Sequence, residues 1–443
     1  MFHERTTTEE DFVTGKSRLI RGIVALVLAV TLAGCAGNAQ YRTSYQPCTA
    51  TAEKTACETA SLEENGDYLL GFVEFDDQGW LWDRKQADAL VDRLLARDAL
   101  ESGLLMVVYV HGWRHNASSG DDNVASFRET LQRIHSYERL ASQSEGRPER
   151  KVAGIYVGWR GLSADLEPFT TLSFWDRKNT ADKIGHGALT DLLVRLEEVQ
   201  LSHLAVYDEG KSRLARTKLI VVGHSFGGQM VYSALSQILI DRFSGVNAEE
   251  PQTFGDLVIL VNPAFEAARF TPLRDLAGVR KWYPDGQLPL VAIFTSESDQ
   301  ATGVAFPAGR WFSTLFENYR DREQKLADRQ TVGHFEPYRT HELRPRPQAA
   351  TLPPPLPEAE QKAAAYRAAQ SARQQWIDLS SRGGWALELG GAQLSHLNRT
   401  VPRNPFYVVS VDKRIIDGHG DIWNPTFLEF MRQFILFTTV VKE

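Results

Sequence analysis

The 443-residue chain has few cysteines and no excess of positive charge. Its 49 lysines and arginines are outnumbered by 56 acidic residues, and the formal net charge of -7 argues against nucleic acid as a partner. None of its three cysteines lies at a spacing typical of a metal site, and neither H-E-x-x-H nor G-x-x-x-x-G-K occurs. We therefore expect neither a metal ion nor another cofactor.

The chain also lacks an apolar run long enough to span a membrane comfortably, because the run at residues 23–30 is short. Basic residues precede this run and small residues follow it, which is typical of a secretory signal peptide. Residues 32–35, Leu-Ala-Gly-Cys, resemble the lipobox of bacterial lipoproteins. This resemblance implies that residues 1–34 are a cleaved signal peptide and that the Cys35 thiol carries lipid. Because Ala36 is not an aspartate, it also implies the outer membrane, facing the periplasm; an uncleaved signal anchor is the alternative.

With Cys35 assigned to the lipid, Cys48 and Cys57 remain as an even pair. In an oxidising compartment they either close a small disulfide loop or stay as free thiols, and both alternatives are open. Residues 35–65 are polar and threonine-rich, which predicts a linker from the membrane to the folded domain.

From residue 66 onwards, short apolar runs alternate with amphipathic helical stretches. The expected strands cover residues 68–75, 104–110, 152–159, 218–222, 257–261, 288–295 and 406–411. Helical patterning covers residues 84–97, 124–134, 189–204 and 424–439. This alternation predicts an α/β domain over residues 66–443, with a mostly parallel sheet flanked by helices.

Residues 305–404 do not follow this alternation, and we interpret them as an insertion or cap before the last strand. They contain a proline run at 352–357 and an alanine-rich helical stretch at 358–376. The proline run favours extended polyproline geometry, which suits either a docking site for a partner or a stiff surface connector.

The most informative stretch is Gly-His-Ser-Phe-Gly-Gly at residues 223–228, between an expected strand and a helical pattern. Strand, G-x-S-x-G and helix together are the context of a nucleophile elbow, in which Ser225 would sit on a strained turn with its hydroxyl lifted clear of the sheet. Gly223 and Gly227 fit this turn, because side chains there would clash with the neighbouring strand and helix. The alternative is a glycine-rich turn that only packs a helix tightly on a sheet.

Two further candidate residues follow later strands, Asp299 after the strand at 288–295 and His419 after the last strand. The carboxyl ends of parallel strands meet at one edge of the sheet, so we expect both side chains to lie near Ser225. His419 would then be the general base, and Asp299 would orient its imidazole. Glu297 is the alternative acid. The alternative bases lie in the insertion: His334, His341 and His396.

The order Ser225, Asp299, His419 along the chain is that of the α/β-hydrolases. With the G-H-S-F-G-G elbow and the V-H-G-W segment that ends at Trp113, the chain resembles this superfamily, and within it a bacterial group with poorly defined substrates. The resemblance implies a serine hydrolase that cleaves an ester-type bond through an acyl-enzyme. It also implies an oxyanion hole made by the backbone N–H groups of Phe226 and Trp113.

The expected substrate is a small-molecule or lipid ester, and protein partners are not indicated by any pattern. Two alternative functions stay open. The same nucleophile suits an acyltransferase, and the same scaffold suits a non-catalytic envelope lipoprotein that binds a partner through its insertion.

Overall fold

A mostly parallel sheet runs through the described part of the chain. The computed structural model describes residues 37–49, 57–162, 169–210, 215–244, 254–346 and 358–440. These residues form a 12-stranded sheet in the order β1-β2-β3-β5-β4-β6-β7-β8-β12-β9-β11-β10. The strands are β1 (Cys48–Thr49), β2 (Leu62–Glu64), β3 (Tyr68–Phe75), β4 (Leu104–Val110), β5 (Lys151–Trp159), β6 (Lys218–His224), β7 (Leu257–Val261), β8 (Val291–Ser296), β9 (His341–Pro345), β10 (Ala386–Leu389), β11 (Ala392–His396) and β12 (Phe406–Val411).

Parallel pairing continues without interruption from β3 across the sheet to β9. The antiparallel pairs among the described strands lie towards the two ends, where β2 meets β3 and where β9, β11 and β10 follow one another. The central strand β4 is buried at every position, as expected of a parallel strand covered on both faces. The prediction of an α/β class with a mostly parallel sheet is therefore confirmed.

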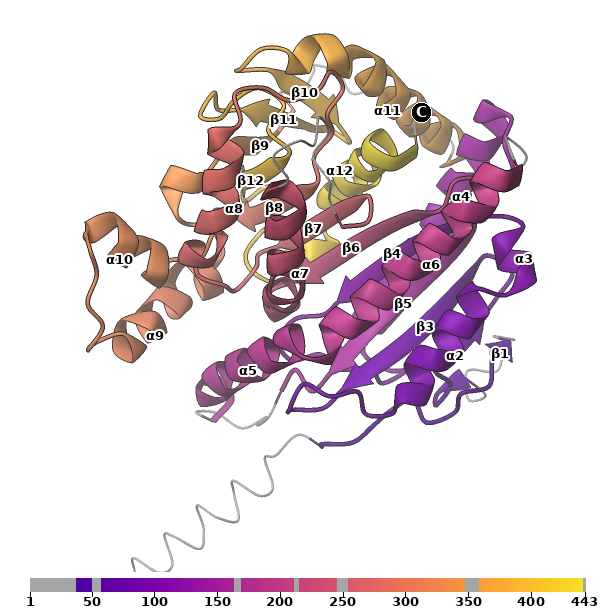
Figure 1. The fold of residues 1–443 in the computed structure, drawn as a ribbon, viewed down its shortest axis with the longest axis horizontal. Helices are drawn as coiled ribbons and strands as arrows, with labels where there is room; N and C mark the ends of the chain where they lie inside the picture. The colour runs from indigo at the N-terminus through magenta and orange to yellow at the C-terminus, as the bar shows by residue number, and fades with distance from the viewer. Residues whose placement is uncertain are drawn as a thin grey trace, which may run out of the picture.

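Helices cover both faces of this sheet (Figure 1). The α-helices are α2 (Arg84–Leu94), α3 (Arg97–Leu100), α4 (Asp122–Glu145), α5 (Phe169–His186), α6 (Ala188–Gly210), α7 (Phe226–Ser244), α8 (Ala267–Val279), α9 (Phe306–Ser313), α10 (Arg322–Arg329), α11 (Glu358–Ser380) and α12 (Pro425–Ile435). Side chains of α2, α6, α7 and α8 share one buried core with the sheet, and those of α4, α11 and α12 share the other. Local signals set helix ends. For example, α4 begins after Asp121, which caps the N–H of Asn123, and ends at the left-handed Gly146.

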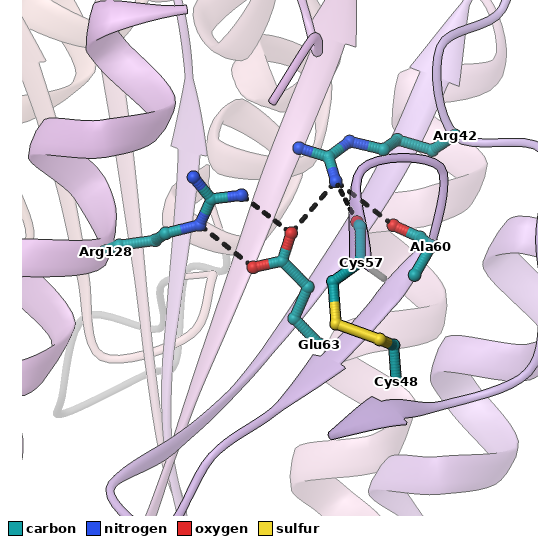
Figure 2. The surroundings of a disulfide bond; sticks show 6 residues. All are labelled: Arg42, Cys48, Cys57, Ala60, Glu63 and Arg128. Atoms are coloured by element: carbon teal, nitrogen blue, oxygen red, sulfur yellow. Dashed lines mark hydrogen bonds and ion pairs between the residues drawn. A yellow bond between two sulfur atoms is a disulfide. The ribbon is translucent and has the colours of Figure 1, made fainter. Parts of the chain in front are cut away.

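The described part of residues 35–65 is not a linker, so that expectation is wrong. It contributes β1 and β2 to the sheet, and Arg42 is fully buried beneath it. A disulfide joins Cys48 and Cys57, whose Cα atoms lie 5.6 Å apart (Figure 2). The polar composition of this segment predicted a linker, but its polar side chains pair with residues far away in the sequence, as Glu63 does with Arg128.

Residues 305–404 divide between the sheet and a projection. β9, β11 and β10 extend the sheet beyond β12, and α11 packs on it through the buried Trp376. Among the described residues of this segment, α9 and α10 stand away from the layers of the fold, at the left of Figure 1. Much of this segment therefore widens the sheet and does not form a cap, which differs from the expectation. The proline run at 352–357 lies outside the described residues.

The expected signal peptide at residues 1–34 and the candidate lipidation residue Cys35 also lie outside the described residues. Within residues 37–440, as far as they are described, no helix combines the length and apolar character that crossing a membrane requires.

Candidate active site

Ser225 lies at the junction of β6 and α7 in a strained backbone conformation. Its φ is +57°, in the left-handed region that non-glycine residues seldom adopt. The N–H of Ser225 donates to the carbonyl of Val261 at 3.0 Å, and its own carbonyl accepts from the N–H of Ala264 at 3.1 Å. These two bonds tie the turn to the end of β7 and hold it in this conformation.

Three glycines allow the backbone to crowd around this turn. A Cβ on Gly223 would lie 2.7 Å from the carbonyl oxygen of Gly227, and one on Gly227 would collide with the carbonyl of Val110. A Cβ on Gly112 would lie 2.8 Å from the Cβ of Ser225. The loop after β4 therefore lies directly against the serine.

His419 connects Ser225 to Asp299. Its Nε2 lies 2.7 Å from the Oγ of Ser225, and its Nδ1 lies 2.8 Å from the Oδ2 of Asp299. A carboxylate only accepts, so Nδ1 carries the proton and Nε2 is free to accept one from the serine hydroxyl. Ser225 and Asp299 are buried, whereas the side chain of His419 is 21% exposed. This is the arrangement in which a base can activate a hydroxyl.

Asp299 is held by the π-helical turn that follows it, Ala301–Ala305. It accepts hydrogen bonds from the backbone N–H groups of Ala301 at 2.9 Å and Thr302 at 3.1 Å, and from the Thr302 hydroxyl. Burial acts to raise the pKa of Asp299, but the hydrogen bond and charge of His419 and the Thr302 bonds outweigh it and lower the pKa. The carboxylate is therefore ionised at neutral pH.

Glu297, the alternative acid, points towards another partner. Its carboxylate pairs with Arg344 at 2.8 Å and accepts a hydrogen bond from the hydroxyl of Ser410 at 3.1 Å. Asp299 is thus the acid that the fold brings to His419.

The alternative bases do not meet Ser225. The Nε2 of His334 lies 3.1 Å from the hydroxyl of Thr302, which itself binds Asp299. His341 and His396 pack against each other at a ring-centroid distance of 5.0 Å, on β9 and β11.

Asn262, which the sequence analysis did not single out, holds the backbone of the histidine loop. Its φ is +46°, and its Nδ2 donates to the carbonyl of His419 at 2.9 Å while its Oδ1 accepts from the N–H of Ser296 at 2.9 Å. His224 donates to the same His419 carbonyl from Nε2 at 2.9 Å. Burial and the charge of His419 lower the pKa of His224 to about 3, so it remains a neutral donor. A polar residue at the end of the apolar run 257–261 is the sequence signal for Asn262.

His111 orders the loop that carries Trp113. Its Nε2 accepts from the N–H of Trp159 at 3.1 Å, and its Nδ1 donates to the carbonyl of Gly112 at 2.8 Å. Burial lowers the pKa of His111 to about 4, so the ring stays neutral in this role. Phe226 is the first residue of α7, where backbone N–H groups have no acceptor within the helix.

Aromatic side chains line up beside the serine. The ring of Phe174 lies 4.7 Å from that of Phe226, 5.6 Å from that of Trp113 and 5.4 Å from that of Trp175. Trp175 in turn lies 5.9 Å from Phe306 at the start of α9. The row is a packed chain of rings from the residue after Ser225 to the start of α9, in which Phe226, Phe174 and Phe306 are buried and Trp113 and Trp175 are partly exposed.

Two cavities lie away from these residues. One of about 420 Å³ opens at the amino ends of β3, β4 and β5, and one of about 610 Å³ lies between α8 and the segment before β12. None of Ser225, Asp299 and His419 lines either cavity. The described residues contain no group of His, Cys, Asp or Glu side chains able to hold a metal ion.

No known protein family model matches the chain, and no curated protein matches it. Among solved structures, it is similar to phospholipase PlaB from Legionella pneumophila in complex with thio-NAD, with 13% sequence identity and a TM-score of 0.23. The likeness covers 56% of this chain and 47% of the phospholipase, so the chain spans about half the length of that structure. A likeness of this size carries no conclusion about the activity of this chain.

Proposed function

We propose that the chain is a serine hydrolase of the α/β-hydrolase type, which cleaves an ester-type bond through an acyl-enzyme. In this proposal Ser225 is the nucleophile, His419 is the general base and Asp299 is the orienting acid. The observation that carries it is the unbroken hydrogen-bond chain from Ser225 Oγ to His419 at 2.7 Å and on to Asp299 at 2.8 Å. A serine in strained geometry at the carboxyl edge of a parallel sheet supports the same assignment.

In the first half of the reaction, Ser225 Oγ attacks the ester carbonyl carbon while His419 Nε2 takes the hydroxyl proton. The ionised Asp299 stabilises the imidazolium that forms. The tetrahedral intermediate then collapses, and His419 gives the proton to the departing alkoxide. In the second half, His419 removes a proton from water, which attacks the acyl-enzyme and releases the acid and Ser225.

The oxyanion of the tetrahedral intermediate needs donors that are already in place. We assign this role to the backbone N–H groups of Phe226 and Trp113, because α7 begins with unsatisfied donors and the loop after β4 lies against Ser225. The bonds of His111 keep that loop in one conformation. One such donor stabilises the transition state by about 3 to 4 kcal/mol.

Asn262 and His224 are positioning residues in this mechanism. Both donate to the carbonyl of His419, at 2.9 Å each, and so fix the backbone from which the imidazole projects. The base then needs no rearrangement before it accepts the proton.

Trp113 and Trp175, the partly exposed members of the aromatic row, favour an ester with an apolar acyl group. We retain lipid attachment at Cys35 and an outer-membrane location facing the periplasm as part of the proposal, on the strength of the sequence pattern at 32–35. An enzyme held at a membrane in this way would have lipid esters within reach.

The decisive test is covalent labelling of the full chain with a small fluorophosphonate. We expect labelling of the wild type but not of Ser225→Ala. The control variant Ser233→Ala, which removes another buried serine, in α7, should be labelled like the wild type. Hydrolysis of a soluble ester by Ser225→Ala should fall by a factor on the order of 10³ or more. Equal labelling of Ser225→Ala would remove the assignment, and an unlabelled, folded wild type would favour the non-catalytic scaffold.

A further inference from the structure

We propose that α9 and the turns on either side of it dock the protein on a lipid bilayer, with the carboxyl edge of the sheet facing the membrane. The inference deepens the proposed function, on which it rests, because it names the bilayer as the source of the ester. The docking patch consists of five large apolar side chains with these exposed fractions: Val304 58%, Trp311 48%, Phe312 67%, Leu315 50% and Phe316 98%.

The docking patch is concentrated in a short stretch of chain that stands off the fold. In Figure 1, α9 and α10 lie at the left margin, outside the layers formed by the sheet and its covering helices. Trp, Phe and Leu gathered on one short helix and its following turn are typical of elements that insert into the boundary between headgroups and acyl chains. Several exposed apolar side chains in one short stretch, with the rings of Trp311 and Phe312 4.9 Å apart, mark an interaction site, unlike single exposed apolar residues.

The docking patch lies at the same edge of the sheet as Ser225. The π-helical turn that leads into α9 starts two residues after Asp299. Further along α9, the guanidinium of Arg310 pairs at 3.3 Å with Glu266, which follows β7. On its inner side α9 packs on Trp175, and the Trp175 ring leaves no room for a side chain at Gly309. These contacts fix α9 over the carboxyl ends of the central strands.

The N-terminal segment leaves the fold at this edge too. The backbone N–H groups of Tyr41 and Arg42 donate to the carboxylate of Glu74, at 2.9 and 2.7 Å, and Glu74 lies next to the last residue of β3. At about 3.5 Å per residue, the chain from Cys35 to Tyr41 spans at most about 20 Å. A lipid on Cys35 would therefore hold this edge close to the bilayer.

Other features of this edge fit a flat apolar partner. β3, beside the chain exit, and β8, which leads to the docking patch, are separated by five strand spacings, or about 24 Å, along one edge. Trp80, which is 72% exposed, lies in the loop after β3. Two points of attachment on one edge orient a molecule on a surface, which a single tether does not.

The charges near the docking patch explain which lipids it should accept. Acidic and basic residues alternate on α10, as in Arg322, Glu323 and Lys325, so this projection has no strong field of one sign. Apolar burial then drives docking, and anionic lipids are not required. The buried aromatic row from Phe226 to Phe306 packs between the serine turn and the start of α9, so it ties the docking patch to the site.

The test uses the full chain on phosphatidylcholine vesicles that contain nitroxide-labelled lipid. A fluorescent amino acid replaces Phe316 or, as a matched control, Trp282, which is 63% exposed and lies between α8 and β8 at the amino edge. We expect quenching at 316 and none at 282, unchanged by high salt. Equal quenching at the two positions, or loss of quenching at 316 in high salt, would overturn the proposal.

A second variant checks that the docking patch itself makes the contact. Trp311→Glu with Leu315→Glu changes two exposed positions, and we expect it to abolish quenching at 316. Unchanged quenching would overturn the proposal. A second result would also overturn it: the wild type self-associates at any salt concentration, the variant does not, and residue 316 is not quenched. The partner of the docking patch would then be a second copy of the chain.

Hydrolysis of a water-soluble ester by the same preparations reports on the proposed function separately. Hydrolysis that depends on Ser225, combined with equal quenching at 316 and 282, overturns docking alone. Quenching at 316 in a protein that hydrolyses no ester supports the docking geometry and overturns the serine hydrolase.

Discussion

Two buried polar networks lie in different parts of this sheet. One joins Ser225, His419 and Asp299 at the carboxyl ends of the central strands. The other lies beside β2, where the carboxylate of Glu63 binds Arg42 at 2.9 Å and Arg128 at 2.7 Å (Figure 2). Both link chain segments that are far apart in sequence, and both are largely shielded from water.

The two networks differ in whether a proton can move through them. The first ends at a hydroxyl on a strained turn, and its imidazole can take that proton and return it. The second joins the carboxylate of Glu63 to two guanidinium groups, which keep their protons at any physiological pH. Arg42 donates to the carbonyl of Cys57 at 3.0 Å and stacks over Phe72, so it holds the N-terminal segment on the sheet. A change in the first network should therefore cost activity, and one in the second should cost stability.

The largest expected effect is that of Asp299→Asn in the first network. The amide would favour the wrong tautomer of His419, and kcat should fall by about 10⁴ while the protein stays folded. The matched control is Glu297→Gln, two residues away, which should leave kcat unchanged because Glu297 binds Arg344. Steady-state hydrolysis of a soluble ester measures both. A loss of kcat in Glu297→Gln without one in Asp299→Asn would assign the acid to Glu297.

Arg42→Met should have the next largest effect, on stability instead of rate. Removing one partner from a buried ion pair costs about 3 to 5 kcal/mol, and kcat per folded molecule should not change. Urea unfolding followed by circular dichroism measures the loss. Arg97→Met is the control, because the Arg97 side chain is 92% exposed in its pair with Glu101, and it should unfold like the wild type. If Arg42→Met also unfolds like the wild type, the second network is not structural.

Replacing both Cys48 and Cys57 by serine should have a smaller effect on the same region. A disulfide that closes so short a loop stabilises by about 2 to 3 kcal/mol, mainly by restricting the unfolded chain. The variant should unfold at lower urea concentration and hydrolyse ester at the wild-type rate. Reductant should lower the urea midpoint of the wild type to that of the variant and leave the midpoint of the variant unchanged. Any other pattern would argue against the disulfide.

The last prediction concerns the pH dependence of stability, where the expected change per pH unit is the smallest of these effects. Burial lowers the pKa of His224 to about 3 from an ordinary value of 6.5. As pH falls from 6.5 towards 3, the unfolded chain binds a proton that the folded chain does not, so stability decreases. The slope contributed by this one group is about 1.4 kcal/mol per pH unit.

His224→Gln should reduce the slope of stability against pH by about 1.4 kcal/mol per pH unit between pH 6.5 and 3. Urea midpoints at several pH values measure this slope. His111→Gln should act in the same way above pH 4, because burial lowers the pKa of His111 to about 4. If neither variant changes the slope, these imidazoles are not kept neutral by the fold.

The central strands were predictable because each is a continuous apolar run. The expected strands at 68–75, 104–110, 257–261 and 406–411 have the same bounds as β3, β4, β7 and β12. Burial on both faces requires such runs, so the pattern is strong. The short outer strands β1, β2, β9, β10 and β11, at the two ends of the sheet, were missed because their residues are partly polar. Their pairing depends on neighbours elsewhere in the chain.

The amino-acid sequence by itself determined the strand, G-x-S-x-G and helix around Ser225, because a turn and its flanking elements depend on residues a few positions apart. It also placed three candidate side chains after three parallel strands. Only the tertiary structure decided between Asp299 and Glu297, paired Cys48 with Cys57 and put Asn262 on the His419 loop. These choices depend on contacts such as that of His419 with Asp299, 120 residues apart, which no local pattern encodes.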